Sequence, residues 1–434
     1  MRRFSVLLLA SLCLTALLTA CETPVEASPS SLRGSPVADD PYDALEILAA
    51  EIVASARLAR ENRASDVPLG KGEGALHVLR LLRRAIDEEL AWADTDHPFF
   101  QAQDERYAKL ALGNPDNLYL VTRADDQAAY KITGRLGSTP DFNIQLYQGY
   151  PGVHRPMRAR GALGLDALVT DEDGNYEVYI GGQERAENWI EMLPGTRRIL
   201  VRFTYGDWAT EEAGEIAIER VGTRGTPGVP ADDAEVASRI LKTSAYLEDA
   251  LTGYLDLVDQ VYEGIEMNTL RPMRQLSGAV GGLSGQSNAT GRYQLRDDQA
   301  LIVTTRPSDA AYQGFQIGTE WFEALDFVNQ TTSLNTTQAR LSSDGLYHFV
   351  ISTRDPGFAN WLDASGAPQG QMLLRWQRVG PLDASHEPKV ELVAFDEIAD
   401  SFPDDEPRMT DAARRDQIAE RQIAIERRYG LSRR

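Results

Sequence analysis

Four stretches of the chain carry apolar residues at intervals of three and four positions, which is the spacing of one face of an α-helix. They span residues 42–62, 74–92, 233–263 and 411–429. None of them is apolar all round, so we expect each helix to bury one stripe against a core and to expose its other side. The expected buried residues are Leu76, Leu79, Leu82, Ile86 and Leu90 in the second helix, and Ile418, Ile423 and Ile425 in the fourth.

Between these helices lie two β-rich regions that carry the same motifs in the same order. Each region has an Asp-Gly pair directly before residues of alternating polarity, and an Asn-Trp pair after them. An apolar run that ends in an arginine and an aromatic residue follows in both. The motifs stand at Asp173-Gly174, Asn188-Trp189 and 199–203 in the first region, and at Asp344-Gly345, Asn360-Trp361 and 372–376 in the second.

The spacing of these motifs also agrees between the two regions. The gap from Asp to Asn is 15 and 16 positions, and Arg135 and Arg306 each stand 38 positions before their Asp-Gly pair. Several matches in order with near-equal gaps indicate an internal duplication. Because Asp-Gly beside alternating residues is a hairpin signal, we predict a mainly β fold with helical insertions. It would consist of two repeated β-sandwich or jelly-roll-like units plus N-terminal, connecting and C-terminal helices.

The N-terminus has the layout of a secretory signal. Arg2 and Arg3 precede an apolar run over residues 4–18, which is shorter than the ~20 apolar residues needed to span a bilayer. The Leu18-Thr19-Ala20-Cys21 sequence that closes it resembles the lipobox of bacterial lipoproteins, in which the cysteine is acylated. That resemblance implies a lipid anchor at Cys21. Glu22 after the cysteine implies sorting to the outer membrane, facing the periplasm.

The patterns together divide the chain into seven expected parts. These are a lipoprotein signal peptide (1–20), a flexible tether (21–41), a helical region (42–112), a first β unit (113–228), a helical connector with a Gly/Ser loop (229–289), a second β unit (290–400) and a C-terminal helix (401–434).

Charge and cysteine content narrow the possible partners. Cleavage before Cys21 leaves 42 basic against 65 acidic residues, a net charge of −23. Such a chain is repelled by nucleic acid and by anionic headgroups, so we expect no nucleic-acid partner, and attachment to the lipid bilayer through the acyl chains of Cys21. Cys13 leaves with the signal, so the folded body has no cysteine for a disulfide, a thiolate nucleophile or a metal site.

Three segments resemble a known family. Asn114-Pro115-Asp116-Asn117, residues 130–135 and residues 334–341 are similar to the domain of unknown function 1214 family, a relative of the 1254 family. The C-terminal helix, with residues 419–422, is similar as well. The resemblance implies an all-β body with helical insertions. It implies no activity and no catalytic residues, because the family is named for having no established function.

The histidines give little support for metal or acid–base chemistry. None of the five is paired at the His-x-His or i, i+4 spacing of a metal site, and no His-Glu-x-x-His motif occurs. We therefore expect no metal and no cofactor.

Two groups of residues could bind a ligand. One loop gathers four cationic candidates that could hold a carboxylate, sulfate or phosphate, or could simply balance nearby acids in solvent. They are His154, Arg155, Arg158 and Arg160. The second group combines paired positions of the repeat with neutral amides, which could orient a ring-bearing ligand or could be core residues. Its members are Arg135, Trp189, Arg306, Asn335, Gln338 and Trp361.

The sequence leaves three functions open, each with a structural signature. A carrier for a small, mainly apolar, partly hydroxylated ligand needs an apolar pocket with few perturbed titratable groups. A hydrolase or glycan-active enzyme with an Asp/Glu pair needs a pocket that holds carboxylates or a histidine with a perturbed pKa. A scaffolding lipoprotein needs an exposed apolar patch on a helix. The lack of catalytic motifs favours the carrier.

Overall fold

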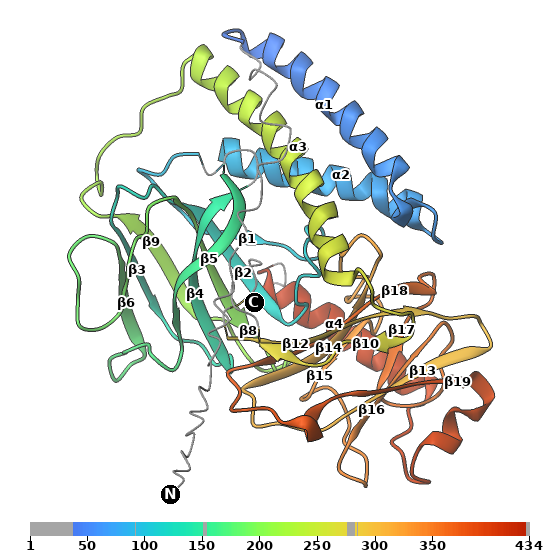
Figure 1. Cartoon of the computed structure of the whole chain (residues 1–434). Helices are drawn as coiled ribbons and strands as arrows, with labels where there is room; N and C mark the ends of the chain where they lie inside the picture. The colour runs from blue at the N-terminus through green and yellow to red at the C-terminus, as the bar shows by residue number, and fades with distance from the viewer. Residues whose placement is uncertain (1–37, 92, 151–153, 276–282, 284, 431–434) are drawn as a thin grey trace, which may run out of the picture. The chain divides into compact units, whose positions relative to one another are not determined.

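The computed structural model of the chain describes residues 38–91, 93–150, 154–275, 283 and 285–430. In this part of the chain the strands form four sheets, two for each repeated region (Figure 1). The predicted mainly β fold with helical insertions is therefore confirmed. Cys21 and the segments predicted as signal peptide and tether lie outside the described residues, apart from positions 38–41.

The first copy is a sandwich of two sheets. One sheet has the order β1 (Gln101–Gln103), β2 (Asn117–Arg123), β8 (Thr196–Thr204), β4 (Asp141–Tyr150) and β5 (His154–Gly164). The other has the order β7 (Trp189–Ile190), β6 (Asn175–Ile180), β3 (Tyr130–Arg135) and β9 (Glu215–Arg220). Alternate residues of both sheets meet in one buried core, which includes Ile132, Val178 and Val201.

The second copy repeats this strand order. Its larger sheet runs β10 (Thr269–Leu270), β12 (Ser287–Gln294), β18 (Gln369–Gln377), β14 (Tyr312–Gly318) and β15 (Ser333–Asn335), with β11 (Arg274–Gln275) also paired to β12. Its smaller sheet runs β17 (Trp361–Asp363), β16 (Tyr347–Ser352), β13 (Gln299–Thr305) and β19 (Lys389–Ala394). The order β2-β8-β4 thus matches β12-β18-β14, and β7-β6-β3-β9 matches β17-β16-β13-β19.

The repeated motifs occupy equivalent places down to single hydrogen bonds. Gly174 and Gly345 both take a positive φ, 81° and 80°, in the turn before β6 and β16. The indole N–H of Trp189 donates to the Gly181 carbonyl at 3.1 Å, and that of Trp361 donates to the Ser352 carbonyl at 3.2 Å.

The Asn-Trp pairs show the same equivalence at their asparagines. The amide of Asn188 bridges the backbone N–H and C=O of Val169 at 2.9 and 2.7 Å, and Asn360 bridges those of Arg340 at 2.7 Å each. The internal duplication predicted from motif order is therefore present in three dimensions.

Four α-helices of the described chain fall where the periodicity predicts them. They are α1 (Pro41–Glu61), α2 (Gly70–Ile86, continued by a π-helical turn, Asp87–Ala91), α3 (Asp233–Tyr262) and α4 (Asp411–Arg428). Asp40, Asp232 and Thr410 cap α1, α3 and α4, because each side chain accepts a backbone N–H of the first turn. We call α1, α2 and α3, which pack against one another on one side of the two copies, the helical layer (Figure 1).

The predicted buried stripe of α2 is wrong. Leu76, Leu79, Ile86 and Leu90 are exposed, and Leu82 is half-buried. The buried side of α2 instead carries Gly70, Gly74, His77, Val78, Leu81, Arg84 and Ala85. In α4, the prediction fails at Ile423, which is exposed, whereas Ile425 is buried.

These corrections share one physical cause. The helices bury polar side chains that find partners far away in the sequence: His77 of α2 meets Glu323 and Arg421 of α4 donates to the Phe327 carbonyl. Gly74 lets Trp321 approach α2, since a Cβ at Gly74 would stand 2.5 Å from the indole ring. A local apolar pattern contains none of this information.

Candidate functional site

Each copy turns a polar sheet face away from its own sandwich core. In β18, Met372, Leu374 and Trp376 belong to the core, so the alternate residues Arg375 and Gln377 lie on the opposite face. In β8, Ile199, Val201 and Phe203 are core residues, and Arg198, Arg202 and Thr204 alternate with them. All of these polar side chains except Arg198 are buried as whole residues, which is unusual for the second face of an antiparallel sheet.

Arg202 and Arg375, the arginine pair, stand at equivalent positions in these two faces. The Arg202 guanidinium donates to the Gln145 amide oxygen at 2.7 Å, to Asn143 at 3.3 Å and to the Tyr147 hydroxyl at 2.6 Å. Arg375 donates to Gln316, which is the equivalent of Gln145, and to the Leu112 carbonyl. Both arginines thus keep the same amide partner in the two copies.

Neither member of the arginine pair is in an ion pair with a described carboxylate. Arg202 is 6 % exposed and Arg375 is 7 % exposed, and the described groups that accept from them are all neutral oxygens. Burial lowers the pKa of the Arg375 guanidinium and the charge of the buried Asp116 raises it, and an arginine side chain stays charged. Burying a cation outside any ion pair costs several kcal/mol, so this part of the structure favours further negative charge.

The two polar faces meet where β8 and β18 end. The Thr204 hydroxyl donates to the Gln377 amide oxygen at 3.3 Å, which joins equivalent positions of the two copies. Tyr119 of β2 pairs with Arg202 of β8 across the sheet. Burial and the charge of Glu105 raise the pKa of its hydroxyl, and the charges of Arg202 and Arg375 both oppose that rise. The Arg202 guanidinium is 5.8 Å from the Tyr119 ring.

Asp116, in the segment that resembles the family motif, connects the copies a second time. Its buried carboxylate accepts hydrogen bonds from Trp208 of the first copy at 2.6 Å and from Tyr312 and Asn335 of the second at 2.6 and 2.8 Å. We call Asp116 with these three donors the Asp116 junction. Arg421 of α4 lies 4.4 Å over the Trp208 ring, so the C-terminal helix closes this junction.

Glu105 is a second buried carboxyl near this region. One of its oxygens accepts from Gln103 Nε2 at 2.6 Å, and the other has no hydrogen-bond partner. Burial raises the pKa of Glu105 to about 8, whereas the hydrogen bond from Gln103 and the charge of Arg84 act in the opposite direction. Glu105 is therefore protonated near neutral pH.

A small cavity lies between the helical layer and the second copy. His77, Tyr254 and Trp321 line it together with Glu320 and Arg63. The His77 ring is held by a hydrogen bond of 2.8 Å between Nδ1 and the buried Glu323 carboxylate, which also pairs with Arg80. The cavity has a volume of about 10 Å³, enough for about one water molecule. An enzyme substrate or a mainly apolar ligand does not fit this space as it stands.

The predicted ligand-binding arginines lie at the surface. Arg135, at the end of β3, is exposed and pairs with Glu215 at 3.3 Å. Arg306 is exposed just after β13, and its carbonyl accepts from Gln313 at 3.0 Å. The structure does not bring either of them to the polar layer between the copies.

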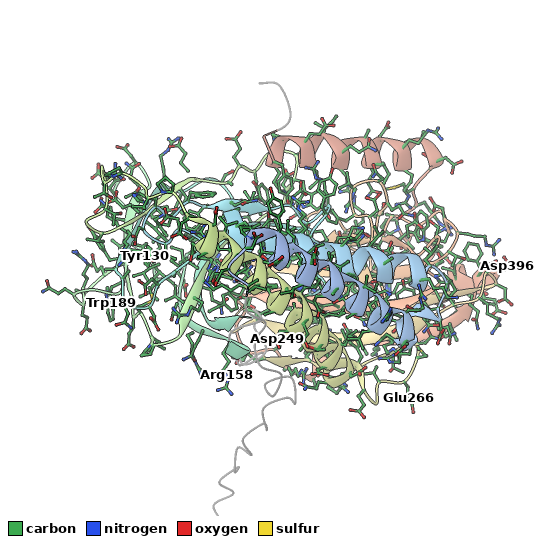
Figure 2. All side chains as sticks on the ribbon, turned by 90° about the horizontal axis from the view of Figure 1, so that it is seen from above. Tyr130, Arg158, Trp189, Asp249, Glu266 and Asp396 are labelled. Atoms are coloured by element: carbon green, nitrogen blue, oxygen red, sulfur yellow. The ribbon has the colours of Figure 1, made fainter. Side chains whose placement is uncertain are left out.

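The other predicted ligand-binding residues hold the fold together. The Asn335 amide donates to Asp116 and to the Gly206 carbonyl, and the Gln338 amide oxygen accepts from the Asn335 backbone. Trp361 is buried in β17, and Trp189 is half-buried at the outer edge of the first copy (Figure 2). These contacts join strands and copies.

The predicted anion-binding cluster is only partly described. His154 and Arg155 begin β5, but their side chains lie outside the described residues. Arg158 is exposed, and Arg160 donates to the Gln148 amide oxygen at 3.2 Å. The arginine pair, which the sequence marked only as a sign of duplication, is the better buried cationic site.

The chain is similar to a crystal structure of an uncharacterised protein from Burkholderia cenocepacia. The two share 28 % sequence identity with a TM-score of 0.76, and the match covers 82 % of this chain and 98 % of the other. The VPA0106 protein from Vibrio parahaemolyticus matches with 11 % identity over 73 % of this chain and 97 % of its own, at a TM-score of 0.42, too low to support a shared fold.

Comparison by sequence does not assign a family. No protein-family model matches the chain, and no curated protein matches it. The resemblance to the domain of unknown function 1214 family therefore stays a prediction. Among the described residues, no three metal-binding side chains come together, and no helix there has the length and apolar content to cross a bilayer.

Proposed function

We propose that this chain is a lipid-anchored protein of the bacterial cell envelope that binds a small organic anion between its two β units. The anchor rests on the Leu18-Thr19-Ala20-Cys21 sequence behind a signal-like apolar run. The ligand rests on the arginine pair: two equivalent guanidinium groups are buried, donate only to neutral oxygens and form no ion pair with a described carboxylate, although the charge of Asp116 acts on Arg375. A bound anion would add negative charge in direct contact with them.

The chemistry of the neighbouring side chains narrows the ligand class. A guanidinium group binds carboxylate and phosphate oxygens through paired N–H donors. The amide oxygens of Asn143 and Gln316, which accept from the arginine pair, each have a second lone pair that can accept from a hydroxyl group of the same ligand. The chemistry of these groups suits a small hydroxylated carboxylate better than the mainly apolar ligand expected from the sequence. The hydrolase and the scaffolding alternatives stay untested.

Thermal-shift measurements on the mature chain test the ligand. Sulfate, phosphate, citrate and gluconate are titrated at constant ionic strength, so that screening does not change. We expect a saturable rise in Tm with at least one of them, since a ligand at a hundred times its Kd adds about 2.7 kcal/mol to the free energy of unfolding. Arg202→Gln and Arg375→Gln should each abolish the rise.

Two controls separate ligand binding from folding. Arg135→Gln removes an exposed arginine of the same repeat and should keep the full Tm rise. Far-UV circular dichroism establishes that each variant is folded, and Arg202→Lys retains a positive charge if the glutamine variant fails to fold. A Tm rise that survives in both folded arginine variants would refute the proposal.

The anchor is tested separately by mass spectrometry of the protein extracted from cell membranes. We expect an N-terminal peptide that begins at Cys21 and carries acyl chains. Cys21→Ala should leave the precursor unprocessed and should prevent acylation. An unmodified Cys21 in the mature protein would exclude the anchor and leave the anion site unaffected.

A further inference from the structure

Exposed apolar side chains concentrate in the helical layer. Of the 17 large apolar residues that are exposed in the described chain, nine lie within residues 42–90. Single exposed apolar residues need no explanation, but a cluster of this kind marks a contact surface. The other eight are distributed over residues 99–423, for example Leu392 of β19 and Ile423 of α4.

The clearest part of this surface is one side of α2. Four apolar residues follow each other along it at intervals of three, seven and four positions, which keeps them on one side of the helix. They are Leu76, Leu79, Ile86 and Leu90, exposed by 44, 53, 39 and 41 %, and we call them the α2 stripe. Each leaves apolar surface in water although Leu81 and Ala85 of the same helix are buried.

The charges beside the α2 stripe are positive. Lys71 and Arg83 are exposed on α2, and none of the exposed described residues from Gly70 to Ala91 is acidic. Arg83 forms a loose ion pair of 3.9 Å with Asp87, but Asp87 is half-buried and burial raises the pKa of its carboxyl, whereas Arg83 is exposed. The chain as a whole has a formal net charge of −21, so this side differs in sign from the average surface. Apolar residues flanked by lysine and arginine are typical of helices that lie in a membrane interface.

The proposed anchor keeps the helical layer within reach of a bilayer. Only 20 positions separate Cys21 from Pro41, the first residue of α1, and a chain of that length reaches at most ~70 Å. Leu81 of α2 shares one buried cluster with Ala59 of α1, so the two helices pack into one body.

We propose that α2 lies on the surface of a phospholipid bilayer. The α2 stripe enters the boundary between headgroups and acyl chains, and Lys71 and Arg83 contact the phosphates. The contact orients the tethered body, with its helical layer toward the membrane. The lipid anchor of the proposed function holds the protein at the membrane. The surface contact through the α2 stripe is a separate property.

Flotation of the mature chain with Cys21→Ser tests this contact without the anchor. The probe is a vesicle of phosphatidylethanolamine and phosphatidylglycerol, and we expect the unacylated protein to float with it. Leu79→Gln combined with Ile86→Gln should weaken the partition at least about tenfold, because two half-exposed apolar side chains lose their place in the membrane. Leu392→Gln combined with Ile423→Gln is the matched control and should float like the parent.

Other occupants of the α2 stripe give different results. If the Cys21→Ser chain does not float, or if the control pair weakens flotation as much as the stripe pair, the proposal is overturned. Sedimentation velocity without vesicles adds the second readout: a dimer that the stripe variants dissociate would make the stripe an interface between copies and would overturn the membrane contact. Anion binding and acylation of Cys21 are measured without vesicles, so their failure is distinguishable.

Discussion

The equivalent tryptophans Trp189 and Trp361 differ in how much they contribute to stability, because α4 covers only Trp361 of the second copy. Trp361 is buried, and the Arg414 guanidinium of α4 lies 5.1 Å over its ring. Trp189 makes the same backbone hydrogen bond but is half-buried at the edge of the first copy (Figure 2). One motif therefore has two different environments.

We expect Trp361→Ala to lower the free energy of unfolding by about 3–5 kcal/mol, as for a buried aromatic residue. Trp189→Ala should lower it by roughly half as much, because less of its surface is removed from water. Urea unfolding followed by far-UV circular dichroism gives both values. Equal losses would contradict the difference in burial, and no loss in either would mean that the tryptophans are not core residues.

Glu105 predicts a pH dependence of stability. Burial raises the pKa of its carboxyl from 4.5 to about 8. A group whose pKa is raised in the folded state contributes stability that is full below its unfolded pKa and is lost as the pH rises through its folded pKa. Relative to Glu105→Gln, the parent should therefore lose at most about 5 kcal/mol between pH 4.5 and 8. Urea unfolding across this range measures the difference.

The exposed Glu187 provides the matched control for this titration. Glu187→Gln should change the pH profile little, because the carboxyl lies in solvent. Parallel profiles for the parent and Glu105→Gln would contradict the buried, protonated state of Glu105.

At the residue scale, the sequence located the repeat but not the site. Arg202 and Arg375 stood out as matching positions, yet nothing local to them indicates that they are buried outside any ion pair. Clustering in sequence favoured the loop around Arg158, which is exposed. Whether a sheet face is buried depends on contacts between segments that are far apart in the sequence. The one local sign of this burial is that an arginine stands at the same position of an otherwise apolar strand in both copies.

At the scale of elements, the positions of the helices follow from the sequence, but the rotation of α2 does not. Its strongest apolar stripe is exposed, because the buried side is held by His77 and Arg80, which both contact the buried Glu323 carboxylate of the second copy. Polar contacts to a residue far away in the sequence outweigh a few leucines in deciding which side turns inward.

Alanine substitutions on opposite sides of α2 test its rotation. Leu81→Ala should cost about 2–5 kcal/mol of unfolding free energy, because Leu81 is fully packed between α1 and α3. Leu79→Ala should stay within about 0.5 kcal/mol of the parent. Thermal and urea unfolding give both values, and a larger cost at Leu79 than at Leu81 would restore the stripe expected from the sequence.

At the scale of the whole molecule, motif order was enough to predict two β sandwiches of one design. Their mutual arrangement was not predictable, since alternating polar residues such as Arg375 and Gln377 normally indicate a strand with one face in solvent. Here that face is buried instead, and the contact between Thr204 and Gln377 joins the ends of equivalent strands. The duplication thus supplied both the fold and the polar layer between its halves.

The Asp116 junction predicts that the two copies unfold together. The Asp116 carboxylate accepts hydrogen bonds from Trp208 in the first copy and from Tyr312 and Asn335 in the second. One carboxylate therefore connects the two copies. Asp116→Asn replaces one acceptor oxygen with a donor and leaves buried donors without a partner, which should cost about 2–4 kcal/mol. Hydrogen exchange followed by mass spectrometry should show equal opening free energies for β8 and β18 in the parent.

In Asp116→Asn, the peptides of β8 and β18 should differ in opening free energy, because each sandwich keeps its own core but loses the shared acceptor. Asp173→Asn, in an exposed turn of the first copy, is the control and should leave the two strands equal. If β8 and β18 still open together in Asp116→Asn, then α4 and the helical layer are sufficient to couple the copies. The Asp116 junction would in that case contribute only its local hydrogen bonds.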